Sequence, residues 1–117
     1  MTRLAIPISS PEGLSSKVND HFALSEYFAI LEADGDKVLS VDILHITADK
    51  DEKKAPDLLA DNGVEVVLAG RIGSCMMRIL RDRGVRMFSG ADGTVKDAFE
   101  SYNKRTLSEV RPNPYLL

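Results

Sequence analysis

The stretch "VEVVLAGRIGSCMMRIL", residues 64–80, predicts a strand followed by a helix and so decides the fold class. Its first part, "VEVVLAG" (64–70), is an almost continuous apolar run, typical of a strand that is buried on both faces of a sheet. The part from residue 73 onward spaces its apolar residues for one helix face, and Gly84 suits the end of that helix. A buried strand followed by a helix is the repeating unit of an α/β layer.

The flanking sequence extends this pattern in both directions. Before it, "DGD" (34–36) is a hairpin signal between two apolar runs, and a third apolar run precedes them, so the first half predicts an antiparallel meander of three strands. After it, another short apolar run and a final amphipathic segment repeat the strand and helix units. We expect strands at residues 3–9, 26–33, 37–46, 64–70 and 85–90, and helices at residues 56–63, 73–84 and 93–105.

These elements predict an α/β fold with a mixed five-stranded sheet flanked by helices. The strands at 3–9, 64–70 and 85–90 are expected to run parallel, joined by right-handed crossovers. The 117 residues, 44% of them hydrophobic, are enough for one domain with one core. We expect that domain to span residues 1–108, followed by a flexible tail at 109–117 that contains two prolines.

Composition limits the function classes. The formal net charge of −3 disfavours nucleic-acid binding, which needs a clearly basic surface. The single cysteine excludes an internal disulfide and fits a reducing compartment. The first residues do not look like a signal peptide, and no apolar run approaches the roughly 20 residues that cross a membrane. We therefore expect a cytoplasmic protein that is not membrane-bound. The sequence leaves the oligomeric state open, and a monomer is the favoured expectation.

Ligands of open α/β sheets bind at the carboxyl ends of the parallel strands. Here those ends are rich in glycine and serine, the helix that starts at Ser74 directs its free amides to the same edge, and Arg71 adds a positive charge. The loop at 10–24 leaves this edge and can fold over it. The sequence thus predicts a pocket for an anionic group, with candidate binding residues Ser9, Ser10, Lys17, Arg71, Gly73, Ser74 and Ser89.

Two residues in these segments are candidate metal ligands. His21 lies in the loop over the predicted pocket, although its spacing alone favours a histidine that caps a neighbouring backbone group, since no second His or Cys is near it in sequence. Cys75 lies in the first turn of its helix beside Arg71, where a soft sulfur ligand could reach a thiophilic metal. From the helical spacing alone, Cys75 could equally be a small residue packed on the flank of the buried stripe.

Four segments together resemble a known family: "AIPIS" (5–9), "DHFALSEYF" (20–28), "LLADNGVEVVLAGRIG" (58–73) and "GTVKDAFESY" (93–102). They resemble, in the same order, the dinitrogenase iron–molybdenum cofactor-binding family of NifX-like and NifB-C-terminal-like proteins. With the residues around them they span most of the chain, from about residue 3 to residue 107. The combination of His-Phe, then Ala-Gly-x-Ile-Gly, then Gly-Thr-Val is fairly specific.

The resemblance implies an RNase H-like three-layer fold and a protein that binds or carries a preformed metal–sulfur cluster without catalysing a reaction. The cluster would contain molybdenum with iron, or molybdenum with copper as in the orange proteins of sulfate-reducing bacteria. Its partners would be cluster donor and acceptor proteins, and His21 would be a cluster contact. The chain departs from the family at Ala23, where glycine is usual, and at residues 74–77, which place Cys75 and two methionines after Ile-Gly.

Two other function classes are alternatives to cluster binding, an enzyme and a cofactor-free interaction module. An RNase H-type nuclease needs carboxylates that hold two Mg²⁺ ions, one of them in the first strand, and residues 3–9 contain none. No P-loop and no pair of nucleophile and base is visible for other enzyme chemistry. The second class is a cofactor-free interaction module that would use the C-terminal tail and Met77, which falls outside the buried stripe of its helix.

Overall fold

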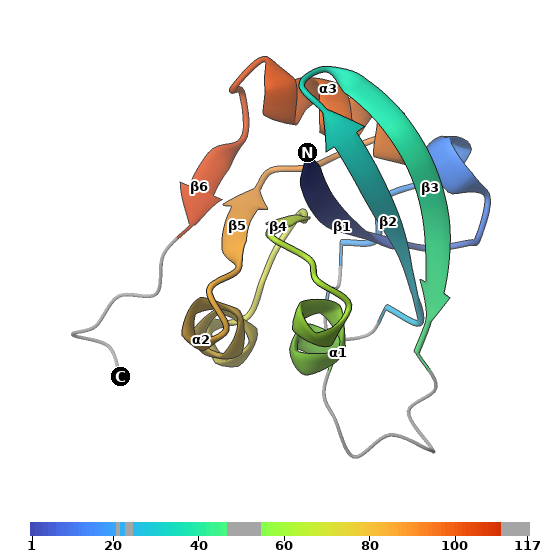
Figure 1. Ribbon diagram of the computed structural model, residues 1–117. Coiled ribbons are helices and arrows are strands. Elements are labelled where there is room, and N and C mark those ends of the chain that lie inside the picture. Colours follow the sequence, from blue (N-terminus) through green and yellow to red (C-terminus); the bar gives the residue numbers. More distant parts are fainter. Residues whose placement is uncertain (21, 23–24, 47–54, 111–117) are drawn as a thin grey trace.

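The computed structural model describes residues 1–20, 22, 25–46 and 55–110 (Figure 1). Within these ranges the chain forms one mixed sheet of six strands with helices on its faces, in the order β3-β2-β1-β4-β5-β6. The elements are β1 (Thr2–Ile8), η1 (Gly13–Ser15), β2 (Tyr27–Asp34), β3 (Lys37–His45), α1 (Ala55–Asp61), β4 (Val66–Leu68), α2 (Ser74–Asp82), β5 (Arg86–Ser89), α3 (Val95–Asn103) and β6 (Ser108–Val110). None of the described helices is long and apolar enough to cross a membrane.

The strand directions confirm the antiparallel meander and the parallel strands predicted from the sequence. β2 runs antiparallel to both β1 and β3, whereas β1, β4 and β5 run parallel to one another. The expected number of five strands was wrong, because β6 pairs antiparallel with β5 at the edge of the sheet. Glu109 and Val110, expected in the flexible tail, belong to this strand, and residues 111–117 lie outside the described part of the chain.

β6 has no strand signal of its own because its sequence, "SEV", has one apolar residue and no alternation. Its position depends on contacts with β5. Val110 pairs with Met87, and the Arg86 guanidinium donates to the Glu109 carboxylate at 3.0 and 3.1 Å. Long-range pairing therefore supplies what local sequence does not.

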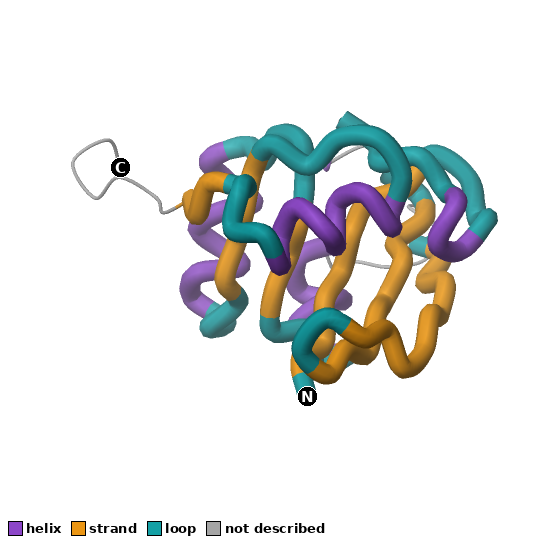
Figure 2. The backbone as a smooth tube through the Cα atoms, turned by 90° about the horizontal axis from the view of Figure 1, so that it is seen from above, coloured by secondary structure: helices purple, strands orange, loops and turns teal. Residues whose placement is uncertain are grey.

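The sheet is the middle of three layers (Figure 2). Leu4, Ile6 and Ile8 of β1 are fully or almost fully buried in a cluster that includes apolar residues of α3, on one face. Ala5 lies in a second cluster on the opposite face, with Leu59 of α1 and Leu80 of α2. Side chains alternate between the two faces along a strand, so a stretch covered on both sides must be apolar throughout, as residues 4–8 of β1 are.

The helix ends follow the predicted signals. α2 begins after Gly73, which is its N-cap, and is followed by Gly84 at φ +75°. α3 begins with a capping box, in which the Thr94 hydroxyl accepts from the Asp97 amide and the Asp97 carboxylate accepts from the Thr94 amide. Met77 differs from the expectation, since it is half-buried against the core on the α1–α2 side. α2 packs on α1 as well as on the sheet, which widens its buried arc.

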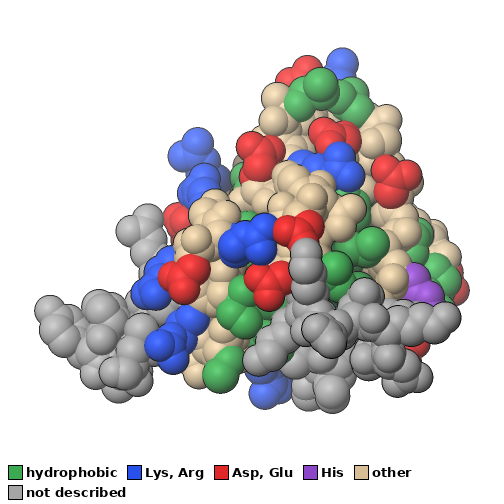
Figure 3. Space-filling view, turned by 60° about the horizontal axis from the view of Figure 1, so that its bottom comes forward, with side chains coloured by type: hydrophobic (Ala, Val, Ile, Leu, Met, Phe, Trp, Pro, Cys, Tyr) green, Lys and Arg blue, Asp and Glu red, His purple; other side chains and the backbone are tan. Residues whose placement is uncertain are grey.

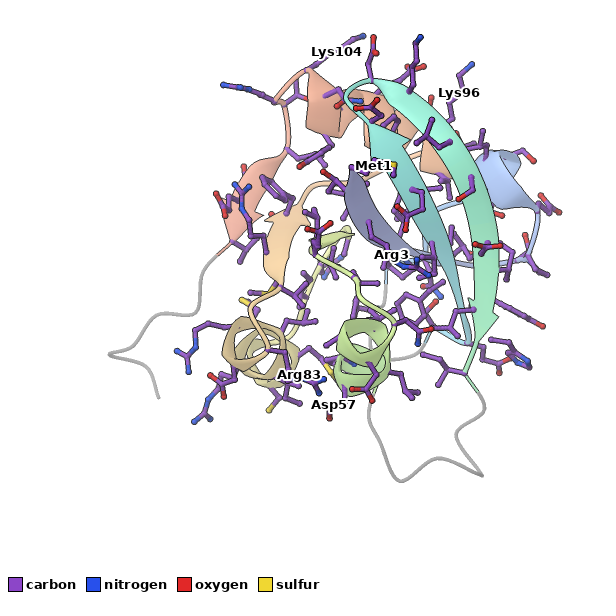
Figure 4. All side chains as sticks on the ribbon, viewed as in Figure 1. Met1, Arg3, Asp57, Arg83, Lys96 and Lys104 are labelled. Carbon is purple, nitrogen blue, oxygen red and sulfur yellow. The ribbon has the colours of Figure 1, made fainter. Side chains whose placement is uncertain are left out.

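Arg83, just after α2, forms ion pairs with α1, the other helix on the same face of the sheet. Its guanidinium lies 2.6 Å from the Asp61 carboxylate and 3.1 Å from that of Asp57, both in α1 (Figure 4). The hydrogen bond to Asp61 is the main reason that the pKa of Arg83 is raised above its ordinary value. Basic and acidic side chains are interspersed on this side of the molecule (Figure 3). Because these ion pairs are exposed to water, each adds little to the stability of the fold.

A matched pair of leucines on neighbouring strands tests the described core. Leu31 of β2 is 0% exposed and Leu39 of β3 is 53% exposed. We expect Leu31→Ala to lower the free energy of unfolding by about 2–5 kcal/mol, because it leaves a cavity. Leu39→Ala should cost less than about 1 kcal/mol, because little apolar surface returns to water. Urea denaturation measures both, and equal losses would contradict the packing described.

The capping box of α3 predicts a pH-dependent contribution to stability. Hydrogen bonds from Thr94, chiefly from its backbone amide, lower the pKa of Asp97 below 3.8. The stabilisation is thus present above pH 3.8 and is lost as the pH falls through the lower pKa of the folded state. Asp97→Asn should therefore lower the thermal midpoint at about pH 7 and have little effect at about pH 2. A difference between the two proteins that does not change with pH would contradict this assignment.

Candidate functional site

The backbone at the carboxyl end of β1 changes its hydrogen-bond partner. β1 pairs with β2 along all seven of its residues, but with β4 only at Leu4 and Ala5. Beyond that point a segment of the following loop, residues 17–19, takes the position beside β1. The Ser9 amide donates to the Lys17 carbonyl at 3.0 Å, and the Asn19 amide donates to the Pro7 carbonyl at 2.9 Å.

The same segment is bonded on its other side to the chain that enters α3. The Val18 amide donates to the Gly93 carbonyl at 2.9 Å, and the Val95 amide donates to the Ser16 carbonyl at 2.9 Å. Val18 also packs against the core on the α3 side. The loop after β1 is therefore folded back on the sheet, across the edge that the sequence predicted for ligand binding.

Gly70, just after β4, is where three segments of chain meet. A Cβ at this position would lie 3.0 Å from Oδ1 of Asp20 and 3.4 Å from the carbonyl oxygen of Ala91. The Gly70 carbonyl also accepts from the Gly90 amide at 3.3 Å. Its φ is not in the left-handed region, so the close approach of the neighbouring segments is the reason for a glycine here.

Asp20 is the residue that sequence reasoning missed. It is next to His21, which was singled out, and its contact partner Gly70 was recognised as part of a glycine-rich strand end. Nothing in the local sequence indicates that these two residues touch, since 50 positions separate them. His21 itself lies outside the described residues, so the structure gives it no position.

The start of α2 lies at the same edge, because this helix follows the carboxyl end of β4. Among the residues that the structure describes, no side chain caps α2, and Gly73, Ser74 and Cys75 are all exposed. The first amides of a helix have no partner within the helix and carry partial positive charge, which favours anions. Arg71 is also exposed, and within the described ranges its guanidinium has no ion-pair partner. The amides and this cation give the edge an anion-attracting character.

The remaining predicted binding residues lie along this edge at different depths. Ser9 is exposed and Ser10 is half-buried, and Lys17 is exposed beside Ser9. Ser89, the last residue of β5, is half-buried and pairs with Ser108 of β6, so it lies one strand further out. The alternation along β1 and β5 directs Ser9 and Ser89 to the face that carries α2. Their roles in binding stay predictions.

The described side chains do not form a metal centre by themselves. No group of three or more His, Cys, Asp or Glu suitable for a metal ion occurs among the residues with described positions. Cys75 is exposed and not packed into the flank of the buried stripe. His45 stacks on Tyr27 with ring centroids 4.6 Å apart and lies 3.9 Å from the Glu26 carboxylate, so it is exposed and held by its neighbours.

Comparison with known proteins identifies the family. A family model described as "Dinitrogenase iron-molybdenum cofactor" matches residues 2–105. A Thermotoga protein named as a NifB candidate is 30% identical, with a TM-score of 0.76 and coverage of 93% of each chain. The apo form of the orange protein from Desulfovibrio gigas is 22% identical, with a TM-score of 0.82 and coverage of 97% of each chain. No curated protein matches the chain.

A third solved structure shares the fold at lower identity. A dinitrogenase candidate from Methanocaldococcus jannaschii is 14% identical, with a TM-score of 0.75, and the match covers 95% of this chain and 96% of that one. At such identities the orange protein and the archaeal protein show the fold alone. The family model and the Thermotoga protein carry the family assignment.

Substitutions at two glycines test whether the segments that carry Asp20 and Ala91 pack against Gly70. Gly70→Ala should displace the Asp20 side chain, because the added methyl group would lie only 3.0 Å from its Oδ1, and should press against the backbone of Asp20 and Ala91. Gly73→Ala is the matched control, since a Cβ there meets nothing within 4 Å. We expect amide chemical-shift changes at residues 18–20 and 90–92 in the first variant only. Equal changes in both variants would show that the loop does not pack on Gly70.

Proposed function

The chain belongs to the dinitrogenase iron–molybdenum cofactor family, and we propose that it binds and carries a preformed, anionic metal–sulfur cluster that contains molybdenum with iron or copper. The cluster is cargo, received from a donor protein and passed to an acceptor, and the protein does not catalyse a reaction on it. The resemblance of four sequence segments to this family supports the proposal, as does the anion-attracting edge of the sheet.

The observation that carries the proposal is the uncapped start of α2. Within the described part of the chain, the amides of residues 74–76 have no capping side chain and the Arg71 guanidinium, in the turn just before them, has no ion-pair partner. Thiometallate clusters carry negative charge, which helix amides and a cation stabilise. Around this centre we place hydroxyl donors and one further cation, namely Ser9, Ser10, Ser74, Ser89 and Lys17, with Gly73 leaving room for close approach.

We propose His21 and Cys75 as the ligands that contact metal directly. A cluster that brings its own sulfides needs few protein ligands, so one imidazole and one thiolate would suffice to fix its orientation. Cys75 is exposed at the start of α2, where its sulfur is accessible to a cluster held by the helix amides. Soft thiolate ligands suit both Cu(I) and iron–sulfur centres.

The finer assignments follow from the same reasoning. We propose a cytoplasmic monomer with an RNase H-like fold. The fold assignment is supported by the order β3-β2-β1-β4-β5, in which β2 alone runs opposite to the other four strands. Exchange of the cluster would use the exposed carboxyl edge, because that is where the binding groups are accessible to a donor or acceptor.

Reconstitution with molybdate, sulfide and copper or iron tests the proposal. Wild-type protein should elute with visible absorbance in the protein fraction. Arg71→Ala should weaken retention of the cluster about tenfold, the value of one charge-assisted contact. Arg78→Ala is the matched control, because Arg78 is also exposed and lies one turn into α2, away from its uncapped end.

The metal ligands are tested in the same preparation by the absorption spectrum. Removing a true ligand changes the charge-transfer bands, so His21→Ala and Cys75→Ala should each alter the spectrum of the retained cluster. Unchanged bands in both variants would leave charge and backbone contacts as the only means of binding. Elution of all the metal with small molecules at near-neutral pH would refute cluster binding.

A further inference from the structure

A hollow separate from the candidate site is lined by residues of α3, β5 and β6 and of the turn between α3 and β6. Figure 1 shows these elements at the end of the sheet away from β2 and β3. Its volume of about 550 Å³ is in the range of small-molecule sites. It opens on the face of the sheet that carries α3, since Phe88 and Tyr102 pack with the core on that side. Its lining residues are Arg86, Phe88, Tyr102, Asn103, Arg105, Leu107 and Glu109.

The floor of this hollow is aromatic and apolar. Phe88 and Tyr102 meet edge to face, with ring centroids 5.1 Å apart and planes at 76°. Leu107 is half-buried beside them and packs against the same core cluster. Such a surface favours a flat apolar group, because aromatic rings pair in offset or edge-to-face geometry.

One wall of the hollow is electrically balanced. The Arg86 guanidinium lies 5.3 Å from the centroid of the Phe88 ring and donates two hydrogen bonds to the Glu109 carboxylate, at 3.0 and 3.1 Å. The charges of Arg86 and Glu109 therefore offset each other. The remaining charged residue of the lining is Arg105, so its guanidinium sets the sign of the ligand that the hollow favours.

Arg105 occupies a backbone position where the chain elsewhere uses glycine. All three α-helices end in the same hydrogen-bonded turn, whose left-handed residue is Gly63 after α1 and Gly84 after α2, at φ +77° and +75°. After α3 this residue is Arg105, at φ +59°. It is the only non-glycine residue with positive φ in the described ranges.

The turn itself is fully formed around Arg105. The Arg105 amide donates to the Tyr102 carbonyl at 3.1 Å, and the Thr106 amide donates to the Ser101 carbonyl at 3.0 Å. A glycine would make these bonds without the steric cost of a Cβ. The Arg105 side chain is exposed, and within the described ranges it has no ion-pair partner to compensate for that cost. Strained residues of this kind are found at binding sites.

We propose that this hollow binds a small aromatic anion. The ring of the ligand lies on Phe88, Tyr102 and Leu107, and its carboxylate or phosphate accepts hydrogen bonds from the Arg105 guanidinium. Asn103, at the last turn of α3, supplies a neutral amide at the rim. This site uses none of the residues proposed for cluster binding and stands whether or not a cluster binds.

Titration with phenyl phosphate, followed by amide chemical shifts of the full chain, tests this site. Shifts should concentrate at residues 86–88 and 102–109. Arg105→Gly should weaken binding at least about tenfold, because among the described lining residues it removes the one cation that no carboxylate pairs. It should also raise the thermal midpoint, because glycine relieves the left-handed backbone. The loss of binding therefore cannot be attributed to unfolding.

Lys104→Ala is the matched control, since Lys104 is an exposed cation next to Arg105 that does not line the hollow (Figure 4). It should change the affinity less than about twofold. Inorganic phosphate should bind at least about tenfold more weakly than phenyl phosphate, because it lacks the ring that covers the apolar floor. A benzoate titration distinguishes the two head groups, and the tighter of benzoate and phenyl phosphate shows whether the site prefers a carboxylate or a phosphate.

Three results would overturn the proposal. The first is undiminished binding of phenyl phosphate by Arg105→Gly. The second is equal affinity for inorganic phosphate, which would show that the aromatic floor contributes nothing. The third is the absence of saturable shifts around the hollow with both benzoate and phenyl phosphate.

Discussion

Past Ala5, where β4 stops pairing with it, the backbone of β1 needs other hydrogen-bond partners. The structure at the carboxyl ends of the parallel strands depends on which segment supplies them. Buried amides and carbonyls without partners are costly. Residues 17–19 supply the partners by bonding to Pro7 and Ser9 on one side and to Gly93 on the other. One short segment thus fills the gap in the sheet and fixes the start of α3, and it carries Asp20 onto Gly70.

The two nine-residue helices, α2 and α3, differ in how their N-terminal amides are satisfied. α3 starts where the inserted segment is bonded, and its own Thr94 and Asp97 satisfy its first amides. α2 starts one strand away, after a turn of glycines and Arg71, and no side chain with a described position satisfies its first amides. An anion gains little at the N-terminus of α3, where the Asp97 carboxylate already accepts from the backbone, and gains more at the N-terminus of α2. The difference between two local sequences therefore decides where negative charge is favoured along the edge.

The parts of the fold that were predictable from sequence are those whose burial follows from periodicity. Residues 4–8 of β1 and all of β4 are apolar because helices cover both faces of the sheet there, and the glycine at 84 ends α2 because the turn requires positive φ. β6 was not predictable, because its stability comes from pairing with β5 and from the Arg86–Glu109 ion pair. The half-burial of Met77 was missed for a related reason, since it depends on how α2 packs on α1.

The residues of the candidate site likewise fall into those that local sequence predicts and those that depend on contacts between distant segments. Arg71, Gly73 and Ser74 follow directly from a strand end and a helix start, so sequence alone placed them at one edge. Asp20 required a contact across 50 positions, which no local pattern contains. The hollow beside α3 could not be predicted from sequence, because one of its walls belongs to β6, which was itself not predicted. Its one sequence signal was the arginine in "NKRTL", at the position after α3 that glycine fills after α1 and α2. An exception to a turn rule, and not a motif, is what marks this second site.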